Sequence, residues 1–237
     1  MMEQRSPLPE IDYKRLLETI LFRGISPDVM QSIVESSHVR QIQAGEFFFF
    51  QEDPIEYLYV LIAGRVKLSQ SDSGGEQVLI QIIGPYFVFG AVALTELSGY
   101  PVCAEAAENS TALVWSRKEF KILVKQYPLL AINCMQLLAQ HAQEVQERFK
   151  QLATQRVERR LASTLLRLAN QTGRKIAEGI LIDIPITRQD LAEMSGTTLF
   201  TVSRLLKQWE EQELVISKRE TVIIRYPHGL VCIAEDI

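Results

Sequence analysis

Four side chains near the C-terminus have the types and the spacing needed to read a DNA duplex. Residues 188–207 read RQDLAEMSGTTLFTVSRLLK. If this segment is helical, its outer face carries Phe200, Ser203, Arg204 and Lys207, at positions i, i+3, i+4 and i+7. An arginine can pair with guanine O6 and N7, a lysine can bind a phosphate, and an apolar ring can contact a thymine methyl group. A helical hairpin with a solvated face is the alternative interpretation of the same pattern.

The residues around this stripe predict the helix-turn-helix that would position it. Gly196 can adopt the positive φ that ends a first helix, and Thr197 or Thr198 can cap a second one. The small Ala192 lies where a crossing helix would come close. The predicted buried face of the second helix consists of Val202, Leu205, Leu206 and Trp209. Because these positions fall in register, we favour DNA binding over the solvated hairpin.

A two-stranded wing is predicted to follow. The β-rich segments Leu214–Ile216 and Val222–Arg225 flank a turn over Ser217–Glu220, whose tip carries Lys218 and Arg219. The sequence therefore predicts a winged helix-turn-helix. The side chains expected to contact DNA are Thr187, Arg188, Gln189, Thr198, Leu199, Phe200, Ser203, Arg204, Lys207, Lys218 and Arg219.

The composition is that of an ordinary globular protein with a modest charge asymmetry. The 237 residues are 47% hydrophobic and 23% charged, which excludes a disordered or collagen-like chain. Residues 155–237 carry 12 basic and 11 acidic side chains, against 13 and 18 in residues 1–154, so the C-terminal part suits a polyanion better. No apolar stretch reaches the roughly 20 residues of a membrane span, and the N-terminus lacks the pattern of a secretory signal. We therefore expect a soluble, cytoplasmic protein with a domain boundary near residue 155.

The N-terminal half changes from helical to β periodicity. Residues 11–35 predict short helices, the second of them opened by Ser26-Pro27. Short β-rich runs separated by glycine and proline follow, which indicates a barrel, roll or sandwich. These runs are Phe47–Phe50, Tyr57–Ile62, Val66–Leu68, Val78–Ile83 and Ala112–Trp115, with turns that include Ser73-Gly74-Gly75. The four phenylalanines are expected to be strand core.

A long helix with two apolar surfaces is predicted to begin at Pro128. Leu130, Cys134 and Leu137 can face the β-domain, while a second stripe repeats with spacings of 4 and 3. That stripe consists of Ala131, Met135, Leu138, Ala142, Val145, Phe149 and Leu152. A helix of about 26 residues would be about 39 Å long. Homodimerisation through the stripe is the favoured interpretation, and a helix buried within its own domain is the alternative.

Several of these segments together resemble the cyclic-AMP receptor protein and fumarate-nitrate reductase regulator (CRP/FNR) family of bacterial transcription factors. The resemblance covers nearly the whole chain. The matching segments are GE at 45–46, YLYVL at 57–61, GRVKL at 64–68, FGAVAL at 89–94, ITRQDLA at 186–192 and TVSRLL at 201–206. It implies an α+β fold with three parts. Residues 1–127 would form an N-terminal β-roll, which resembles the double-stranded β-helix of cyclic-nucleotide-binding domains. Residues 128–155 would form a dimerisation helix and hinge, and residues 156–237 a winged helix-turn-helix.

The positions that hold a cyclic nucleotide in this family carry different residues here. Family members that bind one have a glutamate after a glycine for the ribose hydroxyl, and an Arg-Ser or Arg-Thr pair for the phosphate. In this chain Ala91 follows Gly90, and Pro101-Val102 occupies the place of the pair. Val145 and Gln146 stand where the dimer helix offers hydroxyls to the adenine. Because the charge-assisted phosphate contact is lost, we expect no high-affinity binding of cyclic AMP.

Iron–sulfur and haem sensing, which other family members use, lack clear ligands in the sequence. Cluster-binding members use four cysteines, mostly near the N-terminus, whereas this chain has three and none before Cys103. Haem would need His38, His141 or His228 as axial ligand; we expect surface or capping histidines, and His141 on the long helix is the one to test. Cys103 and Cys134 would form a redox pair only if close in space, and buried structural thiols are favoured. No cofactor and no metal are expected, and a haem- or thiol-based sensor is kept as an alternative.

The effector pocket implied by the resemblance lies between the β-roll and the long helix. Here its lining is apolar and consists of Phe89, Gly90, Ala91, Val92, Pro101, Val102, Leu138, Ala142 and Val145. A small hydrophobic or weakly polar effector fits this lining, and so does a protein that has no effector.

The resemblance also implies how DNA would be read. Family members commonly carry a glutamate four residues before the arginine kept here as Arg204; Phe200 takes its place, and Leu199 stands where the cyclic-AMP receptor has a basic residue. We expect Arg204 to read a guanine, and a symmetric dimer to bind an inverted repeat with half-sites about one helical turn apart. RNA polymerase would be a further partner of an activator.

The sequence argues against two other classes of protein. An enzyme is not expected, because the sequence has no phosphate-binding glycine loop and no GxSxG or HExxH motif. A β-roll regulatory subunit that gates another protein without reading DNA is the second alternative. The exposed position predicted for Arg204 argues against it.

Overall fold

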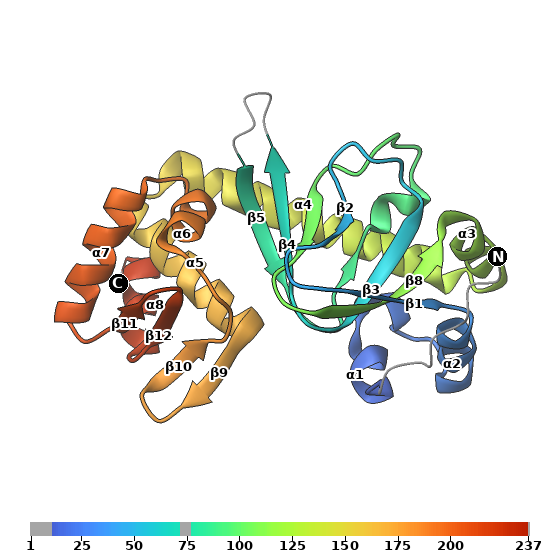
Figure 1. Cartoon of the computed structure of the whole chain (residues 1–237), viewed down its shortest axis with the longest axis horizontal. Helices are drawn as coiled ribbons and strands as arrows, with labels where there is room; N and C mark the ends of the chain where they lie inside the picture. Colours follow the sequence, from blue (N-terminus) through green and yellow to red (C-terminus); the bar gives the residue numbers. More distant parts are fainter. Residues whose placement is uncertain (1–10, 72–76, 237) are drawn as a thin grey trace. The chain divides into compact units, whose positions relative to one another are not determined.

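The computed structural model describes residues 11–71 and 77–236, and it divides into two compact units. Unit 1 comprises Met1–Gln77 and Ile83–Glu144, and unit 2 comprises Val78–Ile82 and Val145–Ile237. Figure 1 shows the helices and strands of each unit along the chain. The predicted turn at residues 73–75 and the N-terminal ten residues lie outside the described part. The three domain ranges given above stay predictions.

Unit 1 begins with the short helices that the sequence predicts. They are α1 (Tyr13–Glu18), the 3-10 helix η1 (Ile20–Phe22) and α2 (Pro27–Glu35). The Asp12 side chain caps α1 by accepting from the backbone N–H groups of Lys14 and Arg15, at 3.1 and 3.2 Å. Pro27 occupies the first turn of α2 as expected, but the Ser26 side chain makes no capping hydrogen bond.

Two four-stranded antiparallel sheets form the rest of the β-roll. The first has the order β1-β8-β3-β6 and the second β2-β7-β4-β5. Their bounds are β1 His38–Ile42, β2 Phe47–Phe49, β3 Tyr57–Ala63, β4 Val66–Ser71, β5 Gln77–Ile83, β6 Val88–Phe89, β7 Cys103–Ala106 and β8 Ser110–Ser116, with η2 at Ala91–Leu94. The five predicted strands are confirmed. The other three strands were not predicted. β1 is largely polar, β6 is two residues long, and β7 is built mostly of small residues.

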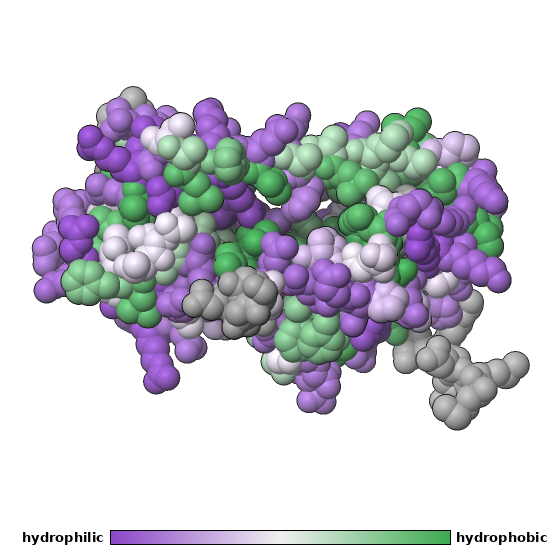
Figure 2. All heavy atoms as spheres, turned by 90° about the horizontal axis from the view of Figure 1, so that it is seen from above, coloured by the Kyte–Doolittle hydropathy of each residue, from purple (hydrophilic) through white to green (hydrophobic). Residues whose placement is uncertain are grey.

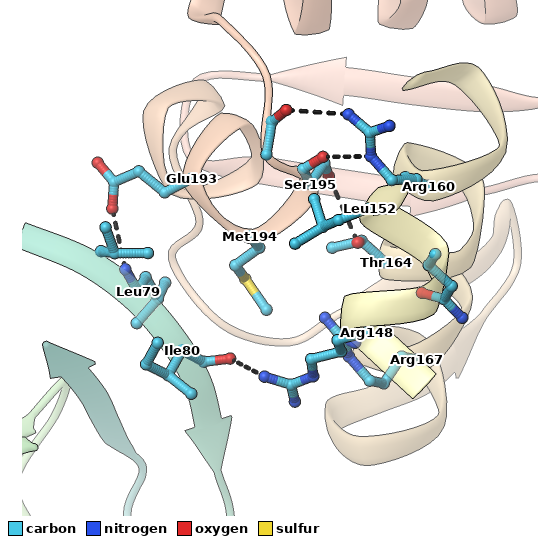
Figure 3. Close-up of a pocket in the computed structure, with 13 residues that line it drawn as sticks. Leu79, Ile80, Arg148, Leu152, Arg160, Thr164, Arg167, Glu193, Met194 and Ser195 are labelled. Atoms are coloured by element: carbon cyan, nitrogen blue, oxygen red, sulfur yellow. Dashed lines mark hydrogen bonds between the residues drawn. The ribbon is translucent and has the colours of Figure 1, made fainter. Parts of the chain in front are cut away.

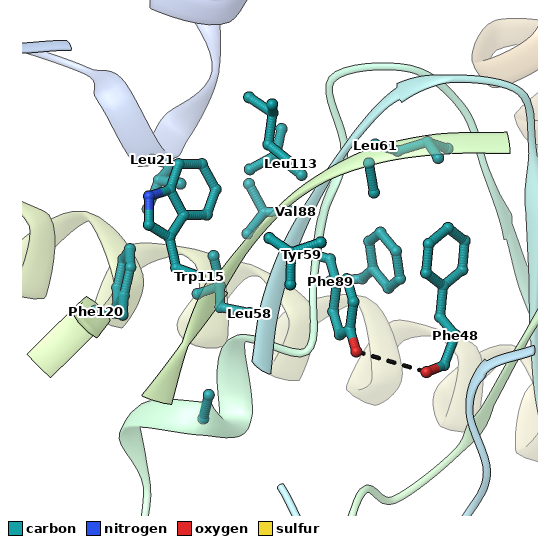
Figure 4. Packing of buried hydrophobic residues seen from close by; sticks show 14 of the residues in the cluster. Leu21, Phe48, Leu58, Tyr59, Leu61, Val88, Phe89, Leu113, Trp115 and Phe120 are labelled. Carbon is teal, nitrogen blue, oxygen red and sulfur yellow. Dashed lines mark hydrogen bonds between the residues drawn. The ribbon is translucent and has the colours of Figure 1, made fainter. Parts of the chain in front are cut away.

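The core of unit 1 combines aliphatic side chains with a group of packed aromatic rings (Figure 4). The Tyr59 ring stacks on Phe89 with centroids 4.9 Å apart and meets Phe48 edge-on at 5.4 Å. Burial raises the pKa of Tyr59, so its hydroxyl stays neutral, accepts a hydrogen bond from Arg40 Nη1 at 3.1 Å and donates to the Phe48 carbonyl at 3.5 Å. The fully buried Trp115 donates from Nε1 to the Ile33 carbonyl at 3.0 Å, which ties α2 to the sheet.

The prediction that all four phenylalanines of residues 47–50 are core is wrong for two of them. Phe48 and Phe49 are buried, whereas Phe50 is 52% exposed and stacks on the half-buried Phe47 with ring centroids 4.4 Å apart. The reason is the strand geometry: β2 ends at Phe49, and its pairing with β7 shifts register between Phe47 and Phe49. The outer two rings therefore cover each other on the surface.

Two further helices follow β8, namely α3 (Arg117–Gln126) and α4 (Leu129–Thr154). The predicted long helix is confirmed at 26 residues. Leu130 and Cys134 of α4 are buried in the core of unit 1, as predicted, and the buried Asn133 donates to the carbonyls of Leu21 and Arg23 at 2.8 and 3.0 Å. In residues 11–71 and 77–236, no single helix has the length and apolarity to cross a membrane, and only α3 and α4 taken together, across a 118° bend, meet those criteria.

Unit 2 holds a second core beneath a four-stranded sheet of order β11-β12-β10-β9. Its elements are α5 Val157–Thr172, β9 Gly173–Ile176, β10 Gly179–Ile182, α6 Arg188–Ser195, α7 Leu199–Glu211, β11 Val215–Lys218, β12 Thr221–Ile224 and α8 Pro227–Glu235. The predicted helix-turn-helix and wing are confirmed, whereas β9, β10 and α8 were not predicted. The core includes Leu161, Leu165, Leu206 and the fully buried Trp209.

We expect Asn133→Ala to destabilise unit 1, because it leaves two carbonyls at the end of η1 without their donors. The loss should be about 2 kcal/mol in the free energy of unfolding. It is measured by urea titration with Trp115 fluorescence in a Trp209→Phe background, which removes the other tryptophan of the chain. Gln136→Ala, on the exposed side of the same helix, is the control. Equal midpoints for the two variants would contradict the anchoring role of Asn133.

Candidate DNA-binding surface

The first helix of the motif, α6, begins with a capping box. The Thr187 hydroxyl accepts from the backbone N–H of Asp190 at 3.0 Å, and the Asp190 carboxylate accepts from the backbone N–H of Thr187 at 2.8 Å. Thr187, predicted to contact DNA, is therefore held by its own helix start. Arg188 and Gln189 are exposed on the first turn, and Gln189 donates to Glu193 Oε1 at 2.9 Å.

The turn between the two helices has the predicted chemistry. Gly196 ends α6 in the left-handed region, with φ 60° and ψ 50°. Of the two threonines considered, Thr198 caps α7, since its hydroxyl accepts from the backbone N–H of Thr201 at 3.3 Å. The backbone N–H of Thr197 instead donates to the Ala192 carbonyl at 2.9 Å and closes the turn.

Arg160 of α5 holds this turn in place, and the sequence did not reveal it (Figure 3). Its guanidinium donates from Nε to the Ser195 carbonyl and from Nη2 to the Gly196 carbonyl, each at 2.9 Å. Nη1 donates to the Gln155 carbonyl at 2.7 Å. One cation therefore satisfies the carbonyl end of α6 and links it to the start of α5. A single arginine among the basic residues of this segment carries no pattern from which this role could be predicted.

The second helix, α7, buries one face and exposes the other. Its buried residues are those predicted: Val202, Leu205, Leu206 and Trp209. Phe200 is 77% exposed, Arg204 and Lys207 are exposed, and Ser203 is half-buried. The structure therefore brings the four residues of the predicted stripe to one surface of one helix.

The wing and the start of α6 border an open hollow of about 470 Å³. Its lining consists of Thr187, Arg188, Ser217, Lys218, Arg219 and Glu220. The backbone N–H of Ile186 donates to the Glu220 carbonyl at 3.1 Å and fixes the wing turn beside α6. Three cations line the hollow against one carboxylate, and the buried Ser217 Oγ has no hydrogen-bond partner among the described residues. The arrangement suits a phosphate group, which accepts from cations and hydroxyls.

The predicted dimer stripe is largely uncovered on α4. Phe149 is 73% exposed, Met135, Val145 and Leu152 are about half exposed or more, Ala142 is exposed, and Ala131 and Leu138 are half-buried. Figure 2 shows apolar residues set among hydrophilic ones on the face that it draws. The heptad positions of the C-terminal half of α4 are thus accessible within a single chain.

The predicted effector lining is crowded where it meets the aromatic core. A Cβ built on Gly90, whose φ is 70°, would lie 2.9 Å from the Tyr57 carbonyl oxygen and 3.5 Å from the Tyr100 ring. Tyr100 stacks on Phe49 at 3.8 Å, and its hydroxyl donates to the Tyr57 carbonyl at 2.7 Å. Phe89 is buried, Ala91, Val92 and Val102 are half-buried and Pro101 is exposed. Among the described residues, no group of three histidines, cysteines or carboxylates is arranged to hold a metal ion.

We expect Arg160→Ala to loosen the helix-turn-helix, because three carbonyls lose their donor. The free energy of unfolding of unit 2 should fall by about 2 kcal/mol, measured by urea titration with Trp209 fluorescence in a Trp115→Phe background. Arg160→Lys should recover little, because a lysine cannot span three carbonyls. Arg156→Ala, an exposed arginine one turn earlier, is the control. If both alanine variants behaved alike, the clamp would be refuted.

Comparison with known protein families agrees with this geometry. Residues 159–233 match the model of a Crp-like helix-turn-helix domain, and residues 39–127 match that of a cyclic nucleotide-binding domain. The global nitrogen regulator of Synechococcus elongatus is 30% identical over 195 residues, which cover 81% of this chain and 87% of that protein. The cyclic AMP receptor protein of Thermus thermophilus is 28% identical over 205 residues, with 86% and 92% covered.

A solved structure shares the fold. It is that of a transcriptional regulator of the CRP/FNR family from Thermus thermophilus, which superposes with a TM-score of 0.69 at 22% identity, over 84% of this chain and 98% of that one. The two domain matches follow each other in the chain, and the relatives are matched over most of their length. The resemblance seen in the sequence is therefore confirmed, and the chain belongs to the CRP/FNR family of DNA-binding transcription regulators.

Proposed function

We propose that this regulator is a homodimer that binds an inverted-repeat operator in duplex DNA. The observation that carries the proposal is the exposed face of α7, where Arg204 and Lys207 lie beside Phe200 on a helix whose other face is fully buried. Such a helix fits the major groove, which is about 12 Å wide. Arg204 is assigned to a guanine and Lys207 to phosphate.

A second set of contacts, outside α7, would hold the duplex backbone. The hollow between α6 and the wing presents Arg188, Lys218 and Arg219. Phosphates seated there would fix the register of α7 without reading sequence. The complex should therefore weaken as the salt concentration rises, since each neutralised phosphate releases counterions.

The dimer is proposed to form through the apolar stripe of α4. Exposed apolar side chains at heptad spacing, such as Val145, Phe149 and Leu152, need a partner, and a parallel copy of the same helix supplies one. Two-fold symmetry of the protein then implies two-fold symmetry of the operator, with half-sites about one helical turn apart. A monomer that read DNA through α7 alone would need no such stripe.

Unit 1 is proposed not to bind a cyclic nucleotide tightly, although its fold is that of a cyclic nucleotide-binding domain. The residues present do not fit the group: Ala91 offers no carboxylate to the ribose, and Pro101-Val102 offers no cation to the phosphate. The Tyr100 ring also packs beneath Gly90. An effector that contacts Phe89, Val92 and Leu138 stays a prediction from the family resemblance.

The thiols of unit 1 are not favoured as a redox sensor. Burial raises the pKa of Cys134 to about 12, so almost none of it is thiolate at neutral pH. Cys103 is also buried, its sulfur accepts from the backbone N–H of Gln51 at 3.2 Å, and neither cysteine forms a disulfide. The histidines are not favoured as haem ligands. His38 lies 3.4 Å from Glu119, His228 lies 3.8 Å from the Cys232 sulfur, and His141 is exposed on α4.

The experiment that tests the proposed function is selection of bound sequences from random duplex DNA by the full chain, at defined salt and without added ligand. Enrichment of an inverted repeat supports a specific dimeric regulator. Enrichment of a single half-site would contradict the dimer. If neither the purified chain nor the chain supplemented with cell extract enriched any sequence, sequence-specific binding would be contradicted.

We expect Arg204→Ala to lower specific affinity without changing the fold. Loss of a bidentate pair with guanine costs about 1 to 3 kcal/mol for the selected operator, and the variant should discriminate less at that base pair. Fluorescence anisotropy with labelled operators measures both effects. The control is Arg225→Ala, an exposed arginine at the end of β12 that pairs with Glu213. Unchanged affinity in Arg204→Ala would remove that residue from base reading.

The dimer stripe predicts a charge-sensitive assembly. Val145→Asp would bury two facing carboxylates in the seam and should yield a monomer that binds the operator at least tenfold more weakly, an effect above about 1.4 kcal/mol. Sedimentation velocity reports the mass, and anisotropy the binding. Gln143→Asp, at an exposed position two residues earlier and outside the stripe, adds the same charge away from the seam and should remain dimeric. A dimeric Val145→Asp variant would exclude the stripe as interface.

A further inference from the structure

Helix α7 begins with two apolar side chains that the core of unit 2 does not use. Phe200 is 77% exposed and Leu199 is 49% exposed, and both lie on the first turn of α7. The core of unit 2 takes Val202, Leu205 and the other buried residues of α7, and it includes neither of these two. Replacing them by polar residues would cost the folded chain little. Their chemistry is therefore explained by something that α7 contacts.

The cations around Leu199 and Phe200 indicate that the partner of this surface is DNA. Arg204 is exposed one turn further along α7, Lys207 one turn beyond it, and Arg188 is exposed at the start of α6. An apolar partner protein would have to desolvate these cations without pairing them, whereas a duplex supplies phosphates and guanine acceptors for them.

The major groove offers a single kind of apolar group. The groups that the bases present there are hydrogen-bond donors and acceptors, and the apolar one among them is the C5-methyl group of thymine. A phenyl ring cannot donate hydrogen bonds to a base edge, as the guanidinium of Arg204 can, and it offers no acceptor in the plane of a base pair. Phe200 thus selects for a methyl group by contact and against a cytosine amino group, which it would desolvate without a partner.

We propose that Phe200, assisted by Leu199, is a specificity-determining residue that reads the C5-methyl group of a thymine in each half-site. The proposal rests on the proposed function and names part of the operator. Phe200 and Arg204 are four residues apart, which is about 6 Å along a helix axis. Base pairs rise by about 3.4 Å. The thymine therefore lies within about two base pairs of the guanine assigned to Arg204.

Uracil tests this assignment because it differs from thymine only by the missing methyl group. Operators found by random selection are synthesised with thymine or uracil at the position within two base pairs of the guanine, and affinities are measured for the full chain. Loss of one buried methyl contact corresponds to about fourfold weaker binding for one half-site, and about 16-fold when both are changed. Phe200→Ala should bind the thymine and uracil operators equally, at about the affinity of the unmodified chain for uracil.

The controls separate base reading from phosphate contact and from folding. Lys207→Ala should weaken binding to both operators by the same factor, so that the thymine preference survives. Leu199→Ala should reduce the preference less than Phe200→Ala does, because Leu199 is the less exposed of the two. Both apolar positions lie outside the core, and equal urea midpoints establish that the variants fold.

Each result decides between the proposals. Three results would overturn the proposed role of Phe200 and leave the proposed operator binding intact. The selected operator could contain no thymine within two base pairs of the guanine, or the unmodified chain could bind the thymine and uracil operators equally. The third is a preference for thymine that survives Phe200→Ala. Unchanged DNA affinity in Phe200→Ala would do the same and would free this face for a protein partner. Failure to select any sequence would overturn both. Loss of discrimination in Phe200→Ala alone supports the assignment.

Discussion

A helix that reads DNA has to be buried on one side and uncovered on the other, and unit 2 is built around this constraint on α7. The apolar residues of α7 recur with the period of the helix, so a single core fixes its rotation as well as its position. Trp209 fills the centre of that core. The rotation of α7 sets which side chains point outward, and the identity of the bases that the protein can contact follows from it.

The same constraint explains why the turn before α7 is held by an arginine. The last carbonyls of α6 have no partner within their own helix, and the chain has to reverse direction immediately after them. Gly196 makes the reversal possible because its φ is positive, and Arg160 satisfies the carbonyls of Ser195 and Gly196 from outside. A glycine alone would leave the turn flexible. The guanidinium makes the turn rigid and connects it to α5.

These two features differ in how far they could be predicted from the sequence. The buried face of α7, the glycine turn and the stripe of α4 follow from local spacing, and local spacing is visible in the sequence. Arg160 acts through carbonyls about 35 residues away, the two-residue strand β6 pairs with distant β3, and Phe50 leaves the core because of a bulge in β2. None of these has a periodic signal, since each depends on contacts that only the folded chain creates.

The β-roll shows the limit of inference from fold to ligand. Residues 39–127 of unit 1 match a cyclic nucleotide-binding domain, and Gly90 has the left-handed conformation at the start of η2. A phosphate, however, needs a cation and a ribose hydroxyl needs an acceptor, and neither Ala91 nor Pro101 has a side chain that could supply one. Position 90 requires a glycine for a packing reason, because its φ is 70° and a Cβ there would lie 2.9 Å from the Tyr57 carbonyl oxygen. A match to a ligand-binding fold therefore describes the backbone, whereas the side chains at the site decide which ligand a domain can bind.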